Sequence, residues 1–143
     1  MKTSRIFAAL AACCIAIVSC TKTDPDANTV TINGATYENV KASCMEEHGL
    51  YFHFDFGDGI TGNGLVDNRI GIETVTFGKD GGYGDWLAIQ ILEPGDKMYT
   101  AVPKTGTQTI KKKGDSYSVV IDGKDENGKV YKVNVLAKIV KEL

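Results

Sequence analysis

Apolar and polar residues alternate along most of this chain, a pattern that predicts β-strands. In the clearest segment, from Leu50 to Phe56, every second residue is leucine or phenylalanine, and the residues between are tyrosine, histidine and aspartate. Side chains point alternately to the two faces of a strand, so this segment would bury one row and expose the other. Residues 29–143 show no convincing amphipathic-helix spacing, which makes β-structure the expected class throughout.

Segments of this kind are separated by clusters of glycine, asparagine, aspartate or proline, as in antiparallel proteins with short turns. Residues 57–67 and 79–85 are rich in glycine and are predicted to be loops. The sequence therefore predicts one all-β domain at residues 29–143, with about eight to nine antiparallel strands in a small β-barrel; a two-sheet β-sandwich is the alternative. The expected strands are 29–32, 35–46, 50–56, 70–78, 86–92, 97–102, 105–112, 117–121 and 131–139.

The register of the last hairpin follows from its apolar rows, which fall on odd-numbered positions in both strands. Both rows can share a face only if the connecting loop has an odd number of residues. We therefore predict that Asp125 pairs with Lys129 and that Gly128 adopts the left-handed region. Within residues 70–77 the apolar positions change from even to odd numbers, which predicts a bulge near Glu73.

The beginning of the chain follows a different pattern. Lys2 and Arg5 precede an uninterrupted apolar run at residues 6–18, which is shorter than the roughly 18 residues needed to span a bilayer. A basic start, a short apolar run and a small residue at its end are typical of a secretory signal peptide, here residues 1–19. Residues 20–28 are polar, contain Pro25, and are predicted to form a flexible tether to the domain.

Ile17-Val18-Ser19-Cys20 resembles the lipobox of bacterial lipoproteins, the motif after which lipoprotein signal peptidase cuts. The resemblance implies that Cys20 becomes the first residue and carries acyl chains, which together hold a protein stably on a membrane. Because Thr21 rather than aspartate follows the cysteine, the resemblance also implies an outer-membrane lipoprotein of the cell envelope. The alternatives are a periplasmic or a surface-exposed position, and an ordinary cleaved signal with Cys20 as a bystander.

Charge and cysteine content narrow the classes of partner. Without residues 1–19 the chain has 14 Lys and Arg against 18 Asp and Glu, so nucleic acid is not an expected partner. Cys13 and Cys14 leave with the signal peptide, and Cys20 is assigned to the lipid. Cys44 then remains alone, which excludes an internal disulfide and leaves stability to the core.

Two patterns could carry chemistry, and each has a simpler interpretation. An even-residue turn at 47–49 would place Cys44 on one face with His53 and Asp55, as in a nucleophilic site, but cysteine also packs as a small apolar residue. The acidic, glycine-rich residues 55–67 lack the ligand spacing of a calcium loop, and neither the histidines nor Cys44 have zinc spacing. We expect no enzymatic activity, no cofactor and no metal site.

Aromatic residues at the loop margins are candidates for binding. Tyr83 lies within residues 79–85, Trp86 follows directly, and Tyr99 lies beyond the next turn. Exposed aromatic rings anchor protein interfaces and also stack on sugars. The simpler interpretation is that Trp86 begins a strand and plugs one end of the barrel.

Residues 97–104 are the second binding candidate and include Met98 and Pro103. Proline is excluded from central strands, so this segment could be an extended, edge-like stretch that lies against another protein. An internal strand that ends at Pro103 is the alternative. The lysine run at 111–113 is predicted to be a solvated strand end, with a phosphate or membrane contact as the alternative.

In size, lipobox, all-β pattern and lack of catalytic motifs, the chain resembles the potempins, small barrel-like lipoproteins that inhibit peptidases released by the same bacterium. The resemblance is architectural and transfers no site residue. It implies a lipid-anchored, extracytoplasmic protein-binding module, most concretely an inhibitor of a secreted peptidase. The alternatives are a surface glycan or small-ligand binder and a structural component of an envelope complex.

Overall fold

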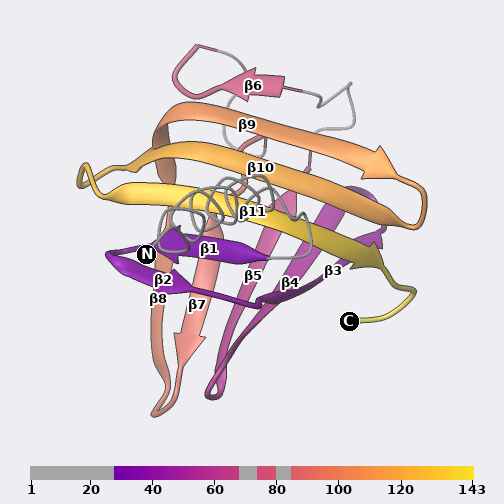
Figure 1. The fold of residues 1–143 in the computed structure, drawn as a ribbon, viewed down its shortest axis with the longest axis horizontal. Helices are drawn as coiled ribbons and strands as arrows, with labels where there is room; N and C mark the ends of the chain where they lie inside the picture. Colours follow the sequence, from indigo (N-terminus) through magenta and orange to yellow (C-terminus); the bar gives the residue numbers. More distant parts are fainter. Residues whose placement is uncertain (1–27, 68–73, 80–84) are drawn as a thin grey trace, which may run out of the picture.

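The computed structural model describes residues 28–67, 74–79 and 85–143, which form eleven β-strands and no helix (Figure 1). The all-β prediction is confirmed. Within these described ranges no helix is long and apolar enough to cross a membrane. The strands are β1 (Thr29–Ile32), β2 (Ala35–Tyr37), β3 (Lys41–Glu46), β4 (Leu50–Gly57), β5 (Ile60–Val66), β6 (Thr74–Thr76), β7 (Ile89–Glu93), β8 (Lys97–Ala101), β9 (Pro103–Lys113), β10 (Ser116–Asp125) and β11 (Val130–Ile139).

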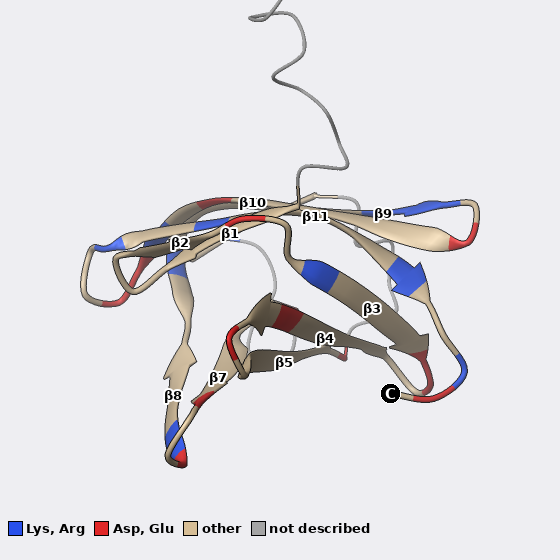
Figure 2. Ribbon diagram, turned by 60° about the horizontal axis from the view of Figure 1, so that its bottom comes forward, with Lys and Arg blue, Asp and Glu red and all other residues tan. Residues whose placement is uncertain are grey.

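All eleven strands belong to one curved sheet. Nine of them follow the order β6-β9-β10-β11-β3-β4-β5-β7-β8, and β1 branches from β11 with β2 beyond it. The sheet folds over on itself as an open half-barrel, with β9, β10 and β11 in one layer and β3, β4, β5 and β7 in the other (Figure 2). The small β-barrel prediction is thus confirmed only in its coarser form, because among the described residues β6 and β8 end the sheet without pairing with each other and leave the barrel open.

The sheet is also not purely antiparallel, because β11 and β3 pair in parallel through Lys138 with Ser43 and Ile139 with Cys44. The tight turn at Asn33 and Gly34 makes β2 run antiparallel to β1, and β1 is itself antiparallel to β11. The break between β2 and β3 does not reverse the chain. β3 therefore continues along the remaining edge of β11 in the same direction as β11, and the single strand expected at residues 35–46 is divided in two.

The core lies on the concave side of this sheet. Phe52 and Phe54 stack with ring centroids 6.3 Å apart, and Phe54 and Phe56 stack at 6.0 Å, so the alternation predicted for β4 is confirmed. The apolar row before and within β7 is buried as expected, although the strand begins only at Ile89. The other buried apolar residues come from both layers of the sheet: Val30, Ile32, Val40, Cys44, Val66, Phe77, Leu87, Ile89, Ile91, Ala101, Ile110, Val119, Ile121, Tyr131, Val133, Val135 and Ala137.

The glycine-rich loop predicted at residues 57–67 is largely a strand, β5, and its glycines have a packing role. A Cβ atom on Gly62 would lie 2.7 Å from Phe56 Cε2, and one on Gly64 would lie 2.5 Å from Leu87 Cδ1. Both glycines face the core, where large side chains of neighbouring segments cover their backbone. Two inner positions of β5 are glycines, and the space beside them is filled by the side chains of Phe56 and Leu87. The sequence of β5 therefore does not show the apolar alternation of a strand.

The two turn predictions have opposite outcomes. In the last hairpin the Asp125 amide donates to the Lys129 carbonyl at 2.8 Å and Gly128 has a φ of 75°, so the odd-loop prediction is confirmed. At residues 47–49 the turn also has an odd number of residues, because Glu46 pairs with Leu50. The even turn is therefore wrong, and Cys44 lies opposite Phe52 in the core.

Residues 70–78 are described only in part. β6 covers Thr74–Thr76 and pairs with β9, whereas the bulge predicted near Glu73 lies outside the described residues. Residues 97–102 and 105–112 are strands as expected, with bounds that differ slightly, because β9 begins at Pro103 and ends at Lys113.

Candidate binding site at the β8 edge

β8 is an edge strand of the sheet. It pairs with β7 along its whole length, with Lys97 opposite Glu93 at one end and Ala101 opposite Ile89 at the other. It has no other strand partner among the described residues. One row of its backbone N–H and C=O groups is therefore left outside the sheet's hydrogen-bond ladder. Such an edge is a template for pairing with another extended chain. The edge-like interpretation of residues 97–104 therefore holds for Lys97–Ala101, whereas Pro103 and Lys104 belong to β9, which pairs with β10.

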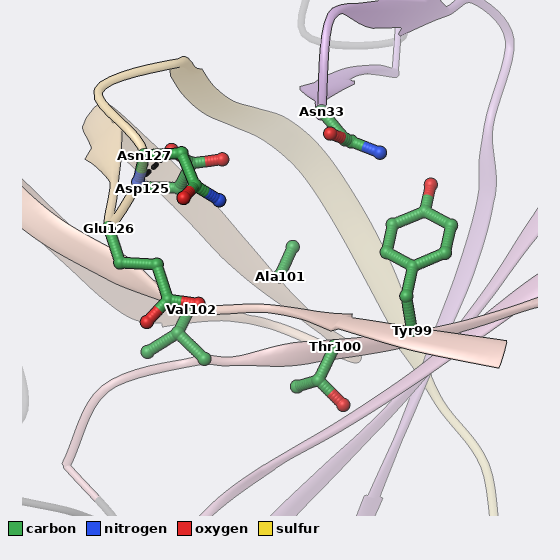
Figure 3. Close-up of a pocket in the computed structure, with 8 residues that line it drawn as sticks. All are labelled: Asn33, Tyr99, Thr100, Ala101, Val102, Asp125, Glu126 and Asn127. Carbon is green, nitrogen blue, oxygen red and sulfur yellow. Dashed lines mark hydrogen bonds between the residues drawn. The ribbon is translucent and has the colours of Figure 1, made fainter.

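A groove with a volume of about 200 Å³ runs beside this edge (Figure 3). One side is the end of β8 and the residue that follows it, and the other side consists of the β1–β2 turn and the β10–β11 turn. Figure 3 shows the side chains of both turns facing the strand across the groove. The lining residues are Asn33, Tyr99, Thr100, Ala101, Val102, Asp125, Glu126 and Asn127.

The turn walls of the groove are held by local hydrogen bonds. Asp125 Oδ1 accepts from the amides of Asn127 and Lys129, each at 2.9 Å. Lys129 Nζ donates to Asn33 Oδ1 at 3.0 Å, which ties the β10–β11 turn to the β1–β2 turn. A site already ordered in this way loses less conformational entropy when it binds.

Tyr99 forms the inner end of the groove. Its ring is partly buried and packs against the core, and burial together with the neighbouring Tyr37 hydroxyl raises its pKa to about 12. The phenol therefore stays protonated at neutral pH and remains a hydrogen-bond donor. Tyr37 is itself fixed by Phe56, with ring centroids 4.6 Å apart.

Met98 faces the convex side of the sheet with 62% of its surface exposed. Its cross-strand partner on β7 is Leu92, which is 42% exposed. Thr61 of β5 continues the same row beyond Leu92. Two adjacent apolar side chains thus lie directly beside the unpaired backbone of β8, so the strand offers both main-chain groups and apolar contacts to a partner.

The other candidate residues do not join this site. Trp86 packs edge-on against Phe77 with ring centroids 5.6 Å apart, and Pro103 is buried at the start of β9. Trp86 and Tyr99 are both packed against the core, so they do not form an exposed aromatic platform of the kind that stacks on sugars. Tyr83 and Cys20 lie outside the described residues.

Two buried polar residues that the sequence analysis did not single out support the strands beneath the site. Gln108 is fully buried; its Oε1 accepts from the Leu87 amide at 2.7 Å and its Nε2 donates to the Asp85 carbonyl at 2.8 Å. Tyr131 donates its hydroxyl hydrogen to the Leu87 carbonyl at 2.6 Å. Both side chains thereby fix the segment that leads into β7, on which β8 depends.

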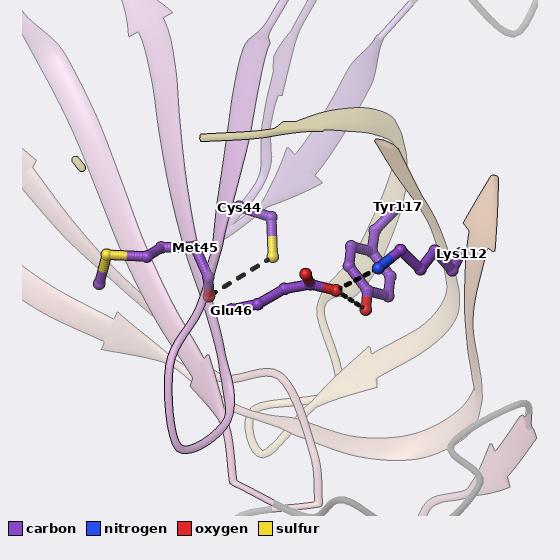
Figure 4. A network of polar contacts seen from close by, with 5 residues as sticks. All are labelled: Cys44, Met45, Glu46, Lys112 and Tyr117. Atoms are coloured by element: carbon purple, nitrogen blue, oxygen red, sulfur yellow. Dashed lines mark hydrogen bonds and ion pairs between the residues drawn. The ribbon is translucent and has the colours of Figure 1, made fainter. Parts of the chain in front are cut away.

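A second polar cluster lies at the ends of β3, β9 and β10 (Figure 4). Glu46 Oε1 accepts from Lys112 Nζ at 2.7 Å and from the Tyr117 hydroxyl, and these two hydrogen bonds lower the Glu46 pKa. Burial and the negative charge of Glu46 raise the pKa of nearby Cys44 to about 12. A thiol with this pKa is a poor nucleophile at neutral pH.

The nucleophilic constellation considered from the sequence is not assembled. Cys44 faces the core, whereas His53 and Asp55 lie on the opposite face of β4, where His53 Nδ1 and Asn63 Oδ1 are 2.9 Å apart. The Asp55 carboxylate accepts from the Gly57 amide at 2.9 Å. Within residues 28–67, 74–79 and 85–143, no three His, Cys, Asp or Glu side chains are grouped so as to hold a metal ion.

The chain matches no protein-family model, and comparisons with curated proteins and with solved structures give no match. Its function must therefore be argued from the β8 edge and its surroundings.

Proposed function

We propose that this protein is a lipid-anchored, extracytoplasmic protein-binding module that engages its partner through β8. The observation that carries the proposal is the edge position of β8, which leaves one side of its backbone without a strand partner among the described residues. An extended segment of a partner can add to such an edge, where main-chain hydrogen bonds give affinity and alternate side chains give specificity.

The most concrete form of this proposal is inhibition of a secreted peptidase. Peptidase clefts commonly hold substrates as extended chains, and β8 is an extended chain held in shape by β7 and by the groove turns. Met98 would enter a pocket on the peptidase, and Leu92 would contact its rim. Because the sheet fixes the strand beforehand, β8 would lose little entropy on entering a cleft.

The lipid anchor at Cys20 belongs to the same proposal and is tested separately. Expression of the full chain in a bacterium that processes lipoproteins should give a membrane-bound protein whose intact mass equals residues 20–143 plus diacylglycerol and an acyl chain. A Cys20→Ser variant should be released from the membrane. An unmodified cysteine in the mature protein would contradict the anchor without affecting the argument for β8.

The binding function is tested by incubating the chain from Thr21 onward with each peptidase that the source bacterium secretes, and by measuring substrate cleavage. A Met98→Lys variant should weaken inhibition at least about ten-fold, because removal of a central interface side chain costs upward of about 1.4 kcal/mol. Leu65→Lys is the matched control, since Leu65 is an exposed leucine on the internal strand β5. If none of the peptidases loses activity in the presence of the protein, the inhibitor form of the proposal is wrong. If the Met98→Lys and Leu65→Lys variants weaken inhibition equally, β8 is not the binding site.

A further inference from the structure

The convex face of the layer β9-β10-β11-β1 carries a concentration of lysines. The strand register places Ser116 of β10 between Lys113 of β9 and Lys138 of β11, so that these three residues form one row across the layer. Lys111 lies in the next row, and Lys132 and Lys124 lie in rows further along the strands. All five side chains are exposed. We call this surface the lysine face; it consists of Lys111, Lys113, Lys124, Lys132 and Lys138.

The charge of the lysine face is opposite in sign to that of the whole chain. Among the described residues of these strands, Asp122 is the one carboxylate on the same face, and it lies 3.8 Å from Lys132. Asp115 and Glu126 lie in the turns at either end. The formal net charge of the chain is −2, whereas the described residues of this face include five lysines and one carboxylate, so its local charge is positive. A local charge of this kind indicates an anionic partner.

Hydroxyl-bearing residues lie among the lysines, beside the apolar Val120, Val130 and Leu136 of the same face. Threonines from β1, β2 and β9 share the convex face, and their side chains can donate hydrogen bonds to phosphate oxygens as the lysines do. The surface therefore offers both charge and neutral donors over several strands. These threonines are Thr29, Thr31, Thr36, Thr105, Thr107 and Thr109.

The described chain begins at this same layer. Asn28 directly precedes β1; its Oδ1 accepts from the Leu136 amide of β11 at 2.8 Å, and its carbonyl accepts from the Val40 amide at 2.9 Å. Asn28 is thus fixed at the edge of β11. Seven residues lie between it and Cys20, and the eight Cα–Cα steps of that connection span at most about 28 Å when fully extended. A lipid on Cys20 would therefore keep this layer within about 28 Å of the bilayer.

We infer that the lysine face rests on the anionic headgroups of the membrane that holds the lipid anchor. This inference depends on the proposed anchor at Cys20. Lysines near an anionic bilayer are attracted to it over about one Debye length, so the short connection and the basic face act together. The β7–β8 hairpin extends away from the layer of β9, β10 and β11 (Figure 2). Docking by the lysine face would consequently hold β8 away from the lipid and toward a partner.

The test uses the full lipoprotein, purified in detergent and checked by intact mass for lipid on Cys20. It is inserted into vesicles of phosphatidylglycerol and phosphatidylcholine in equal parts, or of phosphatidylcholine alone. Acetylation of each lysine is then followed by mass spectrometry. In the anionic vesicles the lysines of the lysine face should react about five-fold more slowly than in phosphatidylcholine, and high salt should remove the difference. Lys97, which lies opposite Glu93 at the tip of the β7–β8 hairpin, should react equally in both.

A pair of matched variants separates the lysine face from general electrostatics. Lys111→Glu should weaken the protection of the remaining lysine-face residues, whereas Lys97→Glu, which changes the net charge equally, should leave it intact. If a protein that carries lipid on Cys20 shows the same lysine reactivity in both kinds of vesicle, the inference is wrong, although the proposed anchor is still supported. Protection of Lys97 instead would show that β8 faces the lipid and would also overturn it. A mature protein without lipid on Cys20 fails at the mass measurement and removes the anchor and this inference together.

Discussion

The hydroxyl of Tyr131 donates a hydrogen bond of 2.6 Å to the carbonyl oxygen of Leu87, and the backbone of Ile89 bonds to the same hydroxyl. Tyr131 lies in the middle of the core on β11, and Leu87 lies in the segment that enters β7 from the other layer. One fully buried side chain thus connects the two layers of the half-barrel.

Replacement of Tyr131 by phenylalanine should destabilise the protein by about 1–3 kcal/mol, because the Leu87 carbonyl loses its hydroxyl donor in a fully buried site. Urea unfolding of the chain from Thr21 onward measures the change. Tyr51→Phe is the control, since Tyr51 is 40% exposed and should lose little. Equal stabilities of the two variants would contradict a role for the hydroxyl.

Gly64→Ala should destabilise by about 1–3 kcal/mol, because the new methyl group would overlap Leu87 Cδ1 and the carbonyl oxygen of Ala88. A second substitution, Leu87→Val, should recover part of the loss by removing the nearest methyl group. Asn63→Ala, at an exposed position of the same strand, is the control. If Gly64→Ala were as stable as Asn63→Ala, the close packing over β5 would be wrong.

Cys44 should be inert toward thiol reagents in the folded protein. Its side chain is fully buried and its pKa is raised to about 12, so very little thiolate exists near pH 8 and reagents cannot reach it. The chain from Thr21 onward contains no other cysteine, so the colour released by Ellman's reagent reports on this residue alone. Reaction should be complete in denaturant and negligible without it; rapid reaction of the native protein would place Cys44 outside the core.

Glu46 should make stability depend on pH in the acidic range. The hydrogen bonds from Lys112 and Tyr117 lower its pKa below the usual 4.5, so its contribution is present above about pH 4.5 and is lost as pH falls through the lower folded value. The contribution should not exceed about 1 kcal/mol, because the Glu46 side chain is 38% exposed. Unfolding midpoints of the natural chain and of Glu46→Gln should differ at neutral pH and converge at low pH. A constant difference across pH would assign the effect to something other than ionisation.

Much of the fold follows from local patterns, and the errors have specific physical causes. The last hairpin could be predicted because both of its strands place apolar residues at odd positions, which leaves one possible register. β5 could not, because Gly62 and Gly64 occupy its inner positions and the apolar groups above them come from Phe56 and Leu87. Alternation in a sequence shows which of a strand's own side chains enter the core. It does not show which side chains from other segments cover the backbone of that strand.

The candidate site was predictable only in part. Pro103 and the turn before Lys97 limited the length of β8, and this pointed to an edge-like segment. The groove beside it depends on turns that are distant in the sequence, at Asn33 and Asp125, which no local pattern connects. Gln108 lies between two threonines and reads as a polar strand position, yet it is buried because two backbone groups from residues 85–87 satisfy its amide.

The central place of β11 has a consequence for biosynthesis. β11 is synthesised after the ten other described strands, and it pairs with β10 on one side and with both β1 and β3 on the other. Before residues 130–139 have emerged, no ladder among the described residues joins the block β3-β4-β5-β7-β8 to the block β6-β9-β10. A nascent chain that lacks residues 130–139 therefore cannot complete the sheet, and the two blocks can join only after all ten of the preceding strands have been made.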